Sequence, residues 1–439
     1  MPSAETCRRR ARKPGEDRTV KSFDIRSTGR RRKLWVEWRG CRSENVCMIE
    51  QTTVADGRAV ANVPERESKR VRLGSLAGVN GYIANLDGIR GIAVLLVLAS
   101  HTVGLFGGML GVDIFFVLSG FLITNLLLVE HESNTSLAVF YWRRFLRLMP
   151  ALAVLTFAVL LASPHLPRAS SPRCEVLAPL LGVANWTMPF GLDCPKYMGH
   201  AWSLSVEEQF YLVWPLLLLA SLKLGGVRSA LALAIALTVG CGLWRAYLAL
   251  HGANITRIYW PLDTRCDGLL MGAAAALAQF NAGTGWFYRV SRLLWIPAAL
   301  ALIAIVALAK SHTPFFVGGY TIIAVLSVIL IVAASRANAG LLDRLLGAKP
   351  LVYLGTLSYG FYLWHYPIAV QAGRWKVSGG VKFVVVGGLA FCLAYLSKRL
   401  VEIPLLRLRP QVVTRPWLGW IVACTSTASV IFGIFLFLP

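Results

Sequence analysis

Ionisable side chains interrupt the apolar stretch of residues 85–128, and their types could do chemistry inside a membrane. The stretch carries Asp87, Arg90, His101 and Asp113. A charged group in hydrocarbon costs several kcal/mol unless it faces a partner or a wet cavity, so such residues indicate a site. Arg90 and His101 are eleven residues apart. That is roughly three helical turns plus about 20°, which predicts one shared helix face and a rise of about 16 Å. We expect a fixed cation and a titratable imidazole that face one channel at two depths.

Carboxylates are expected at the depth of His101. A short link follows its helix, so the next helix should be an antiparallel neighbour and should bring Asp113 close to the ring. A carboxylate beside an imidazole fixes its tautomer and stabilises its charged form. The segment SLSVEEQF brings Ser203, Glu207 and Glu208 to the same level, where they could hold an acceptor hydroxyl. The alternatives are a hydrogen-bonded core histidine at His101 and a helix N-terminal charge at Glu208.

Arginines are concentrated in the run FYWRRFLRLMP at residues 140–150. Arg144 and Arg147 are three residues apart and share a helix face. Guanidinium groups bind phosphate through two parallel hydrogen bonds. The alternative is a set of ordinary positive anchors at the cytoplasmic surface. Because Arg90 is expected at the same surface, a phosphate site is favoured.

Composition indicates a polytopic membrane protein. Of the 439 residues, 56% are hydrophobic and 15% charged, whereas soluble proteins carry about 25% charged residues. The net charge of +23 is what the positive-inside rule predicts for many helices, so nucleic-acid binding is disfavoured. The nine cysteines show no metal-ligand spacing, and no metal is expected. Cys174 and Cys194 share one loop. The sequence does not decide between a disulfide and two free thiols at these positions.

Residues 1–80 form a polar, basic tail that we expect to be disordered and cytoplasmic. Eleven long apolar segments follow this tail. Lys and Arg are enriched in the loops that are cytoplasmic when the N-terminus is inside, which predicts an extracytoplasmic C-terminus. Asp267 and His365 fall within these segments and could line the same cavity. No soluble catalytic domain is expected. The expected spans are 86–104, 109–130, 148–163, 203–222, 229–250, 264–280, 293–310, 316–335, 350–371, 380–401 and 417–438.

Seven motifs, in order, resemble those of the membrane-bound acyltransferase 3 family, whose members O-acylate O-antigen, exopolysaccharides, nodulation factors, peptidoglycan or macrolides. The resemblance implies an all-α polytopic fold with ten core helices in residues 81–405, followed here by a linker and one additional transmembrane helix in residues 406–439. It also implies that acyl-CoA is the donor, used from the cytoplasmic side, with Arg90 and His101 in the central roles. Arg143, Arg144 and Arg147 would lie near the coenzyme. The motifs are LDGIRGIAVLLVLASH, GVDIFFVLSGFLI, FYWRRFLRLMP, SLSVEEQFYLVWP, DTRCDGLLMG, LSYGFYLWHYP and VEIP.

Acyl transfer to a cell-surface or secreted carbohydrate is therefore the expected function, with acetyl as the expected acyl group by family frequency. His101 would act as general base on an acceptor hydroxyl or as a transient acyl carrier, and Asp113 would orient its ring. A secondary transporter or flippase is the alternative, because it also places ionisable groups in the membrane. Such proteins often have paired halves with broken helices, which we do not find here. The expected catalytic residues are His101, Asp113 and Glu207, and the expected acceptor-binding residues are Ser203, Glu208, Asp267 and His365.

Overall fold

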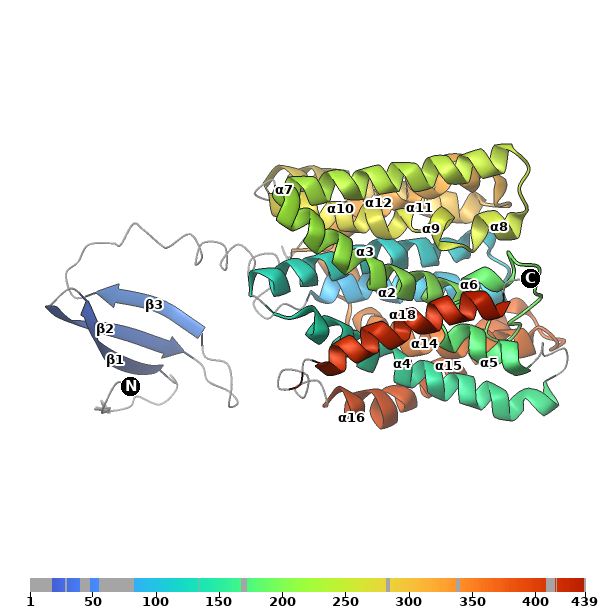
Figure 1. Ribbon diagram of the computed structural model, residues 1–439, viewed down its shortest axis with the longest axis horizontal. Coiled ribbons are helices and arrows are strands. Elements are labelled where there is room, and N and C mark those ends of the chain that lie inside the picture. The colour runs from blue at the N-terminus through green and yellow to red at the C-terminus, as the bar shows by residue number, and fades with distance from the viewer. Residues whose placement is uncertain are drawn as a thin grey trace. The chain divides into compact units, whose positions relative to one another are not determined.

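The chain divides into two units, residues 1–72 and residues 73–439, and each is described by itself. The computed structural model of the protein is drawn in Figure 1. It describes residues 18–27, 30–39, 48–54, 83–133, 135–166, 172–281, 285–336, 340–407, 415 and 417–437.

The first unit contains a three-stranded antiparallel sheet in the order β1–β2–β3. The strands are β1 (Arg18–Ser27), β2 (Arg30–Arg39) and β3 (Met48–Val54). Arg18 is opposite Arg39 in the β1–β2 ladder, and the β2–β3 register shifts between Glu37 and Trp38. No regular sheet was expected here. The prediction of a disordered tail falls mostly on residues outside the described ones, and it stays a prediction.

The second unit is built from helices. Its first half runs through α2 (Ala84–Thr102), η1 (Phe106–Leu110), α3 (Gly111–Glu132), α4 (Leu137–Ala162), η2 (Ser163–His165), α5 (Pro172–Leu180), α6 (Ala184–Thr187) and α7 (Ala201–Leu250). Its second half runs through α8 (Ile255–Tyr259), α9 (Leu262–Arg265), α10 (Asp267–Asn281), α11 (Gly285–Leu308), η3 (Phe315–Gly319), α12 (Tyr320–Ala334), α13 (Leu341–Leu346), α14 (Lys349–Ala372), α15 (Gly379–Ser397), η4 (Lys398–Glu402), α16 (Ile403–Leu406) and α18 (Trp417–Phe437).

Several of the expected spans differ from the helices in their bounds. The helix α4 begins at Leu137 rather than near residue 148, because the arginine-rich run is itself helical and arginine is a good helix former. The expected spans 203–222 and 229–250 correspond to two helices that meet at a kink within α7, and the bend is visible in Figure 1. The bend lies at Gly225 and Gly226, and Gly226 has φ 66°, a backbone conformation that favours glycine.

Seven helical segments among the described residues are long and apolar enough to cross a membrane. The apolar helix Asp267–Phe280 within α10 is shorter. An all-α polytopic fold for the second unit is therefore confirmed. The division into ten core helices plus one stays a prediction.

Close packing of α14 against α2 positions several of the candidate site residues. A Cβ atom at Gly355 of α14 would collide with the backbone oxygen of Asp87 in α2. Small residues let two membrane helices approach this closely. One end of α14 therefore lies beside Asp87 and Arg90. Further along the same pair of helices, the ring centroids of His101 and His365 are 5.4 Å apart.

Candidate active site

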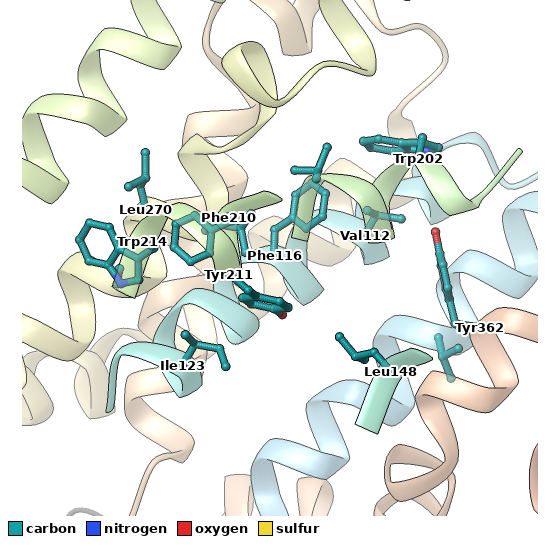
Figure 2. Packing of buried hydrophobic residues seen from close by; sticks show 14 of the residues in the cluster. Val112, Phe116, Ile123, Leu148, Trp202, Phe210, Tyr211, Trp214, Leu270 and Tyr362 are labelled. Atoms are coloured by element: carbon teal, nitrogen blue, oxygen red, sulfur yellow. The ribbon is translucent and has the colours of Figure 1, made fainter. Parts of the chain in front are cut away.

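A cavity of about 720 Å³ lies among α2, α3, α4, α7 and α14. Figure 2 shows Tyr362 and Leu148 across an open space from Phe116 and Tyr211. Three of these side chains, those of Tyr362, Leu148 and Phe116, line the cavity. Most of the lining is apolar, but it includes the ionisable side chains of Asp87, Arg90, Arg144, Arg147 and Glu207. We call the part of the wall formed by the three arginines the arginine end.

The arginine end of this cavity carries donors that suit an anion. Arg90 Nη1 donates to Asp87 Oδ1 over 2.7 Å, and its side chain remains 22% exposed. The guanidinium of Arg144 lies 3.8 Å from the centre of the Tyr211 ring. Its Nε is buried and has no hydrogen-bond partner among the described residues. A buried donor without a partner is costly, and a phosphate oxygen in the cavity would satisfy it. The coenzyme-binding residues expected here fit this environment, with one exception.

The exception is Arg143. Its Nη1 donates to Glu130 Oε1 over 3.0 Å. Its side chain is not among the described residues that line the cavity. Although Arg143 and Arg144 are adjacent in sequence, successive helix positions point in different directions. The structure thus separates Arg143 from Arg144 and Arg147.

Glu207 lies in the middle of the cavity wall. Its Oε1 accepts a hydrogen bond from Ser119 Oγ and its Oε2 one from the Tyr211 hydroxyl, each over 2.9 Å. These bonds connect Glu207 to the ring beneath Arg144. The neighbouring Glu208 is half-buried and lies outside the described lining.

Ser203 and Tyr362 form a hydrogen-bonded pair in the cavity wall. The Ser203 and Tyr362 hydroxyl oxygens are 2.7 Å apart, and the Tyr362 hydroxyl is also 3.1 Å from the His200 carbonyl oxygen. Both residues line the cavity. His101 lies beyond them, outside the described lining. The cavity that Arg90 lines therefore does not reach His101 among the described residues.

Three imidazole rings lie beyond Tyr362. His101 is on α2, His365 is on α14, and His200 directly precedes α7. Ring centroids are 5.4 Å apart for His101 and His365, 5.7 Å for His200 and His365, and 5.3 Å for Tyr362 and His365. Tyr366 contacts His101 at 5.0 Å and His200 at 4.9 Å. We call His101, His200, His365 and Tyr366 the histidine cluster.

The tautomers of two of these histidines follow from their bonds. His101 Nδ1 is 2.9 Å from the Val97 carbonyl oxygen, and His365 Nδ1 is 2.6 Å from that of Tyr362. Because a carbonyl only accepts, each Nδ1 carries the hydrogen and each Nε2 holds a lone pair. Burial, together with the neighbouring His101, lowers the pKa of His200 to about 3, so that ring is neutral at ordinary pH.

The expected partner of His101, Asp113, is held elsewhere. Asp113 Oδ1 accepts from Arg265 Nη2 over 2.8 Å, and both side chains are buried. Asp267 is likewise 2.7 Å from the fully buried Arg245. The expectation that Asp113 orients the His101 ring is therefore corrected, because the Val97 carbonyl does so. Asp113 and Asp267 are thus each part of a buried ion pair. Neither carboxylate belongs to the described lining of the cavity.

Sequence reasoning missed His200 and Tyr366. His200 lies three residues before Ser203, and Tyr366 directly follows His365. Their position beside residues already chosen was the available signal. Helical periodicity gave none, because His200 lies outside the regular helix.

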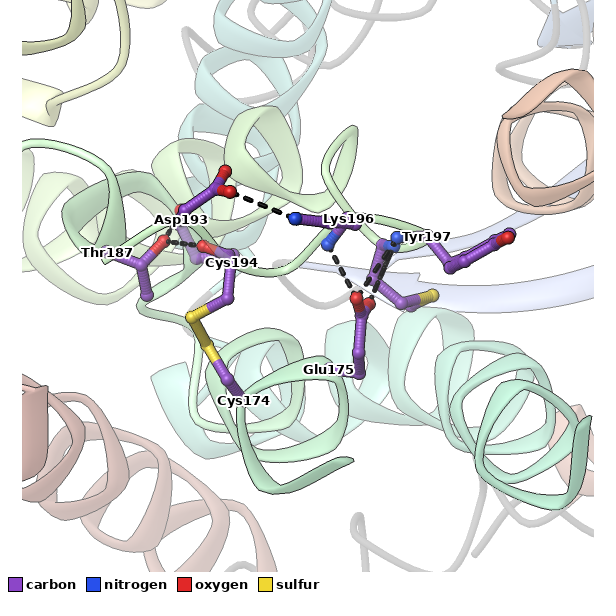
Figure 3. The surroundings of a disulfide bond; sticks show 9 residues. Cys174, Glu175, Thr187, Asp193, Cys194, Lys196 and Tyr197 are labelled. Atoms are coloured by element: carbon purple, nitrogen blue, oxygen red, sulfur yellow. Dashed lines mark hydrogen bonds and ion pairs between the residues drawn. A yellow bond between two sulfur atoms is a disulfide. The ribbon is translucent and has the colours of Figure 1, made fainter. Parts of the chain in front are cut away.

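A disulfide holds the segment that carries His200. Cys174 and Cys194 are bonded, so the bonded alternative is the one found. Figure 3 shows Glu175 beside this bond, where it accepts from the backbone N–H groups of Lys196 and Tyr197. The Tyr197 hydroxyl donates to Gln371 of α14 over 3.3 Å. These contacts fix the segment before α7 against the end of α14.

Comparisons with known proteins give a consistent result. A family model described as an acyltransferase domain matches residues 83–399. The peptidoglycan O-acetyltransferase OatA of Listeria monocytogenes is 36% identical over 353 residues, which cover 74% of this chain and 56% of that protein. The putative peptidoglycan O-acetyltransferase YrhL of Bacillus subtilis is 33% identical, with 74% and 55% covered. The O-acetyltransferase OatA of Staphylococcus aureus is 32% identical, with 74% and 57% covered. The chain thus spans little more than half the length of these relatives. No solved structure matches it.

Proposed function

The chain belongs to the acyltransferase family whose model spans residues 83–399, and from this premise we propose that it is a membrane O-acetyltransferase. The acceptor is a hydroxyl of a cell-surface carbohydrate, with peptidoglycan favoured by the names of the relatives. The donor is acyl-CoA, most simply acetyl-CoA. The observation that carries the proposal is the cavity with Arg90, Arg144 and Arg147 at one end and the histidine cluster beyond the other.

The residues divide the work as follows. Arg144 and Arg147 hold phosphates of the coenzyme, for which the unpartnered Nε of Arg144 is suited. The apolar walls around Phe116 and Leu148 enclose the arm that carries the thioester. His101 offers the Nε2 lone pair, either to take the acceptor's proton or to carry the acetyl group. In both routes the acceptor oxygen forms the new ester bond and the carbon–sulfur bond breaks. The acceptor hydroxyl loses one proton, and the coenzyme sulfur gains one to become the free thiol.

The orientation follows from the same assignment. The arginine end faces the cytoplasm, where acyl-CoA is found, and the histidine cluster faces outward toward the carbohydrate. The Cys174–Cys194 bond lies in the segment that leads to His200, and disulfides persist in oxidising compartments. This agrees with a cytoplasmic N-terminus and an extracytoplasmic C-terminus.

The test uses the purified full-length chain in nanodiscs with acetyl-labelled acetyl-CoA and a soluble peptidoglycan glycan fragment. We expect free thiol and acetyl ester to form in equal amounts. Release of no thiol, with or without the glycan, would refute the proposal. Movement of label across the bilayer without thiol release would instead identify the protein as a transporter.

A further inference from the structure

The histidine cluster contains a second imidazole that the transfer described above does not use. His365 is 0% exposed. Its Nδ1 is bonded to the Tyr362 carbonyl, and its Nε2 is buried without a hydrogen-bond partner among the described residues. Such an unpaired buried group costs about 1–3 kcal/mol, and in a folded protein it calls for an explanation such as a catalytic role.

His101 and His365 are matched in their bonding. In each ring Nδ1 is bonded to a carbonyl of its own helix, which leaves Nε2 as the basic nitrogen. The two rings lie 5.4 Å apart between centroids. They differ in exposure, because His101 is exposed and His365 is fully buried. The exposed ring therefore has space beside it for an acetyl group, and the enclosed ring lies next to it.

Direct transfer from thioester to acceptor needs one base, whereas transfer through an acyl-enzyme needs a nucleophile and a separate base. The pair supplies both groups side by side. Resting on the proposed function, we propose that His101 carries the acetyl group on Nε2 and that His365 Nε2 is the base that deprotonates the acceptor hydroxyl. His365 is thus a second catalytic residue of the transfer, rather than a residue that only lines the acceptor site.

The two steps balance. In the first, His101 Nε2 bonds to the acetyl carbon, the carbon–sulfur bond breaks with its electron pair on sulfur, and the thiolate takes a proton from water to become free thiol. In the second, the acceptor oxygen attacks the acetyl carbon while its proton passes to His365 Nε2, and the carbon–nitrogen bond breaks with its pair on His101. His365 then returns that proton to water, so the net products are ester and thiol.

The polar groups that face His365 have been described above, and the remaining neighbouring ring is that of Phe361. His101 comes from α2, His200 from the segment before α7, and Tyr362 and Tyr366 from α14 itself. Among the described residues, no carboxylate forms an ion pair or hydrogen bond with His365. The base therefore has neutral neighbours, and no fixed charge competes for its proton.

The test separates the two steps with matched variants, His101→Asn and His365→Asn. An asparagine amide can replace Nδ1 as donor to Val97 or Tyr362, but it offers no basic Nε2. The full-length proteins in nanodiscs are mixed with labelled acetyl-CoA without acceptor, and thiol release and protein-bound label are measured. The glycan fragment is then added, and loss of label from the protein is followed.

Wild-type protein is expected to release about one thiol per chain, to retain the label, and to lose it when the glycan is added. His365→Asn should show the same first release but discharge at least about 100-fold more slowly, as expected for a lost general base. His101→Asn should show no first release. His312→Gln, at a histidine bonded to Tyr320 outside the cluster, should match wild type in both steps.

Several outcomes would overturn the proposal. Discharge of His365→Asn at the wild-type rate would remove its role as base. Equal loss of both steps in a His365→Asn protein that still binds acetyl-CoA would show a structural role, and His365→Gln checks this result with a longer amide. Wild-type transfer without protein-bound label would show direct transfer. Each of these leaves the proposed O-acetyltransferase function intact, whereas a wild-type protein that releases no thiol overturns both.

Discussion

Tyr362 and Ser203 share a hydrogen bond of 2.7 Å between their hydroxyl oxygens. Both residues line the cavity that Arg90 also lines. On its other side the Tyr362 ring contacts His200 and His365, each at 5.3 Å between centroids. We therefore predict that movement of Tyr362 away from Ser203 lets the thioester of the proposed reaction reach His101.

Loss of this hydrogen bond is expected to open the barrier. Tyr362→Phe and Ser203→Ala each remove it, and a bond of this kind contributes about 1 kcal/mol, which corresponds to about a fivefold effect. We expect each variant to raise acceptor-independent thiol release from acetyl-CoA by about that factor. Tyr362→Phe also removes the contact with the His200 carbonyl. Because Ser203→Ala breaks only a bond that Tyr362→Phe already removes, the double variant should not exceed Tyr362→Phe alone. Additive effects, or no increase at all, would contradict this role of the pair.

Removal of the cavity arginines should weaken donor binding. Arg144→Ala deletes the guanidinium over the Tyr211 ring and Arg147→Ala deletes a second lining cation. A charged hydrogen bond contributes about 1.5–3 kcal/mol, so KM for acetyl-CoA should rise at least about tenfold with kcat changed less. The matched control is Arg143→Ala, whose partner is Glu130 outside the described lining. Equal KM increases for all three variants would mean a general charge effect rather than a phosphate site.

Replacement of Asp113 should lower the stability of the fold and leave the rate of thiol release per folded chain unchanged. Asp113→Asn leaves Arg265 as an uncompensated charge whose side chain is only 1% exposed, and breaking a buried pair in this way costs about 3–5 kcal/mol. We expect a low yield of folded protein and a lower melting temperature in detergent. The folded fraction should still release thiol at the wild-type rate per chain. A stable variant with a lost reaction would restore Asp113 as an orienting residue for His101.

The sequence predicts those features of the site that depend on local periodicity. The eleven-residue spacing of Arg90 and His101 places them at different depths of one helix, and the three-residue spacing of Arg144 and Arg147 places both at the cavity. In the same way, the Gly225–Gly226 pair is where the two expected spans separate.

Long-range pairing is what periodicity cannot supply. Asp113 and Arg265 are 152 positions apart, so no local pattern shows that Arg265, rather than His101, receives the carboxylate. The hydrogen bond between Tyr362 and Ser203 likewise joins residues 159 positions apart. His200 was missed for the same reason, since only the packing of the segment before α7 on α14 brings it to His365.

The Cys174–Cys194 bond should hold the histidine cluster together. The two cysteines are 20 positions apart, and closing a loop of this size stabilises a fold by about 3 kcal/mol. We expect Cys174→Ser to lower the melting temperature and to slow acetyl transfer, because the freed segment carries His200 and contacts α14 through Tyr197. A reductant should have the same effect on wild type and none on the Cys174→Ser/Cys194→Ser protein. Cys392→Ser, at an exposed free thiol of α15, is the control and should behave as wild type. Complete alkylation of Cys174 in unreduced wild-type protein would show that the bond does not form.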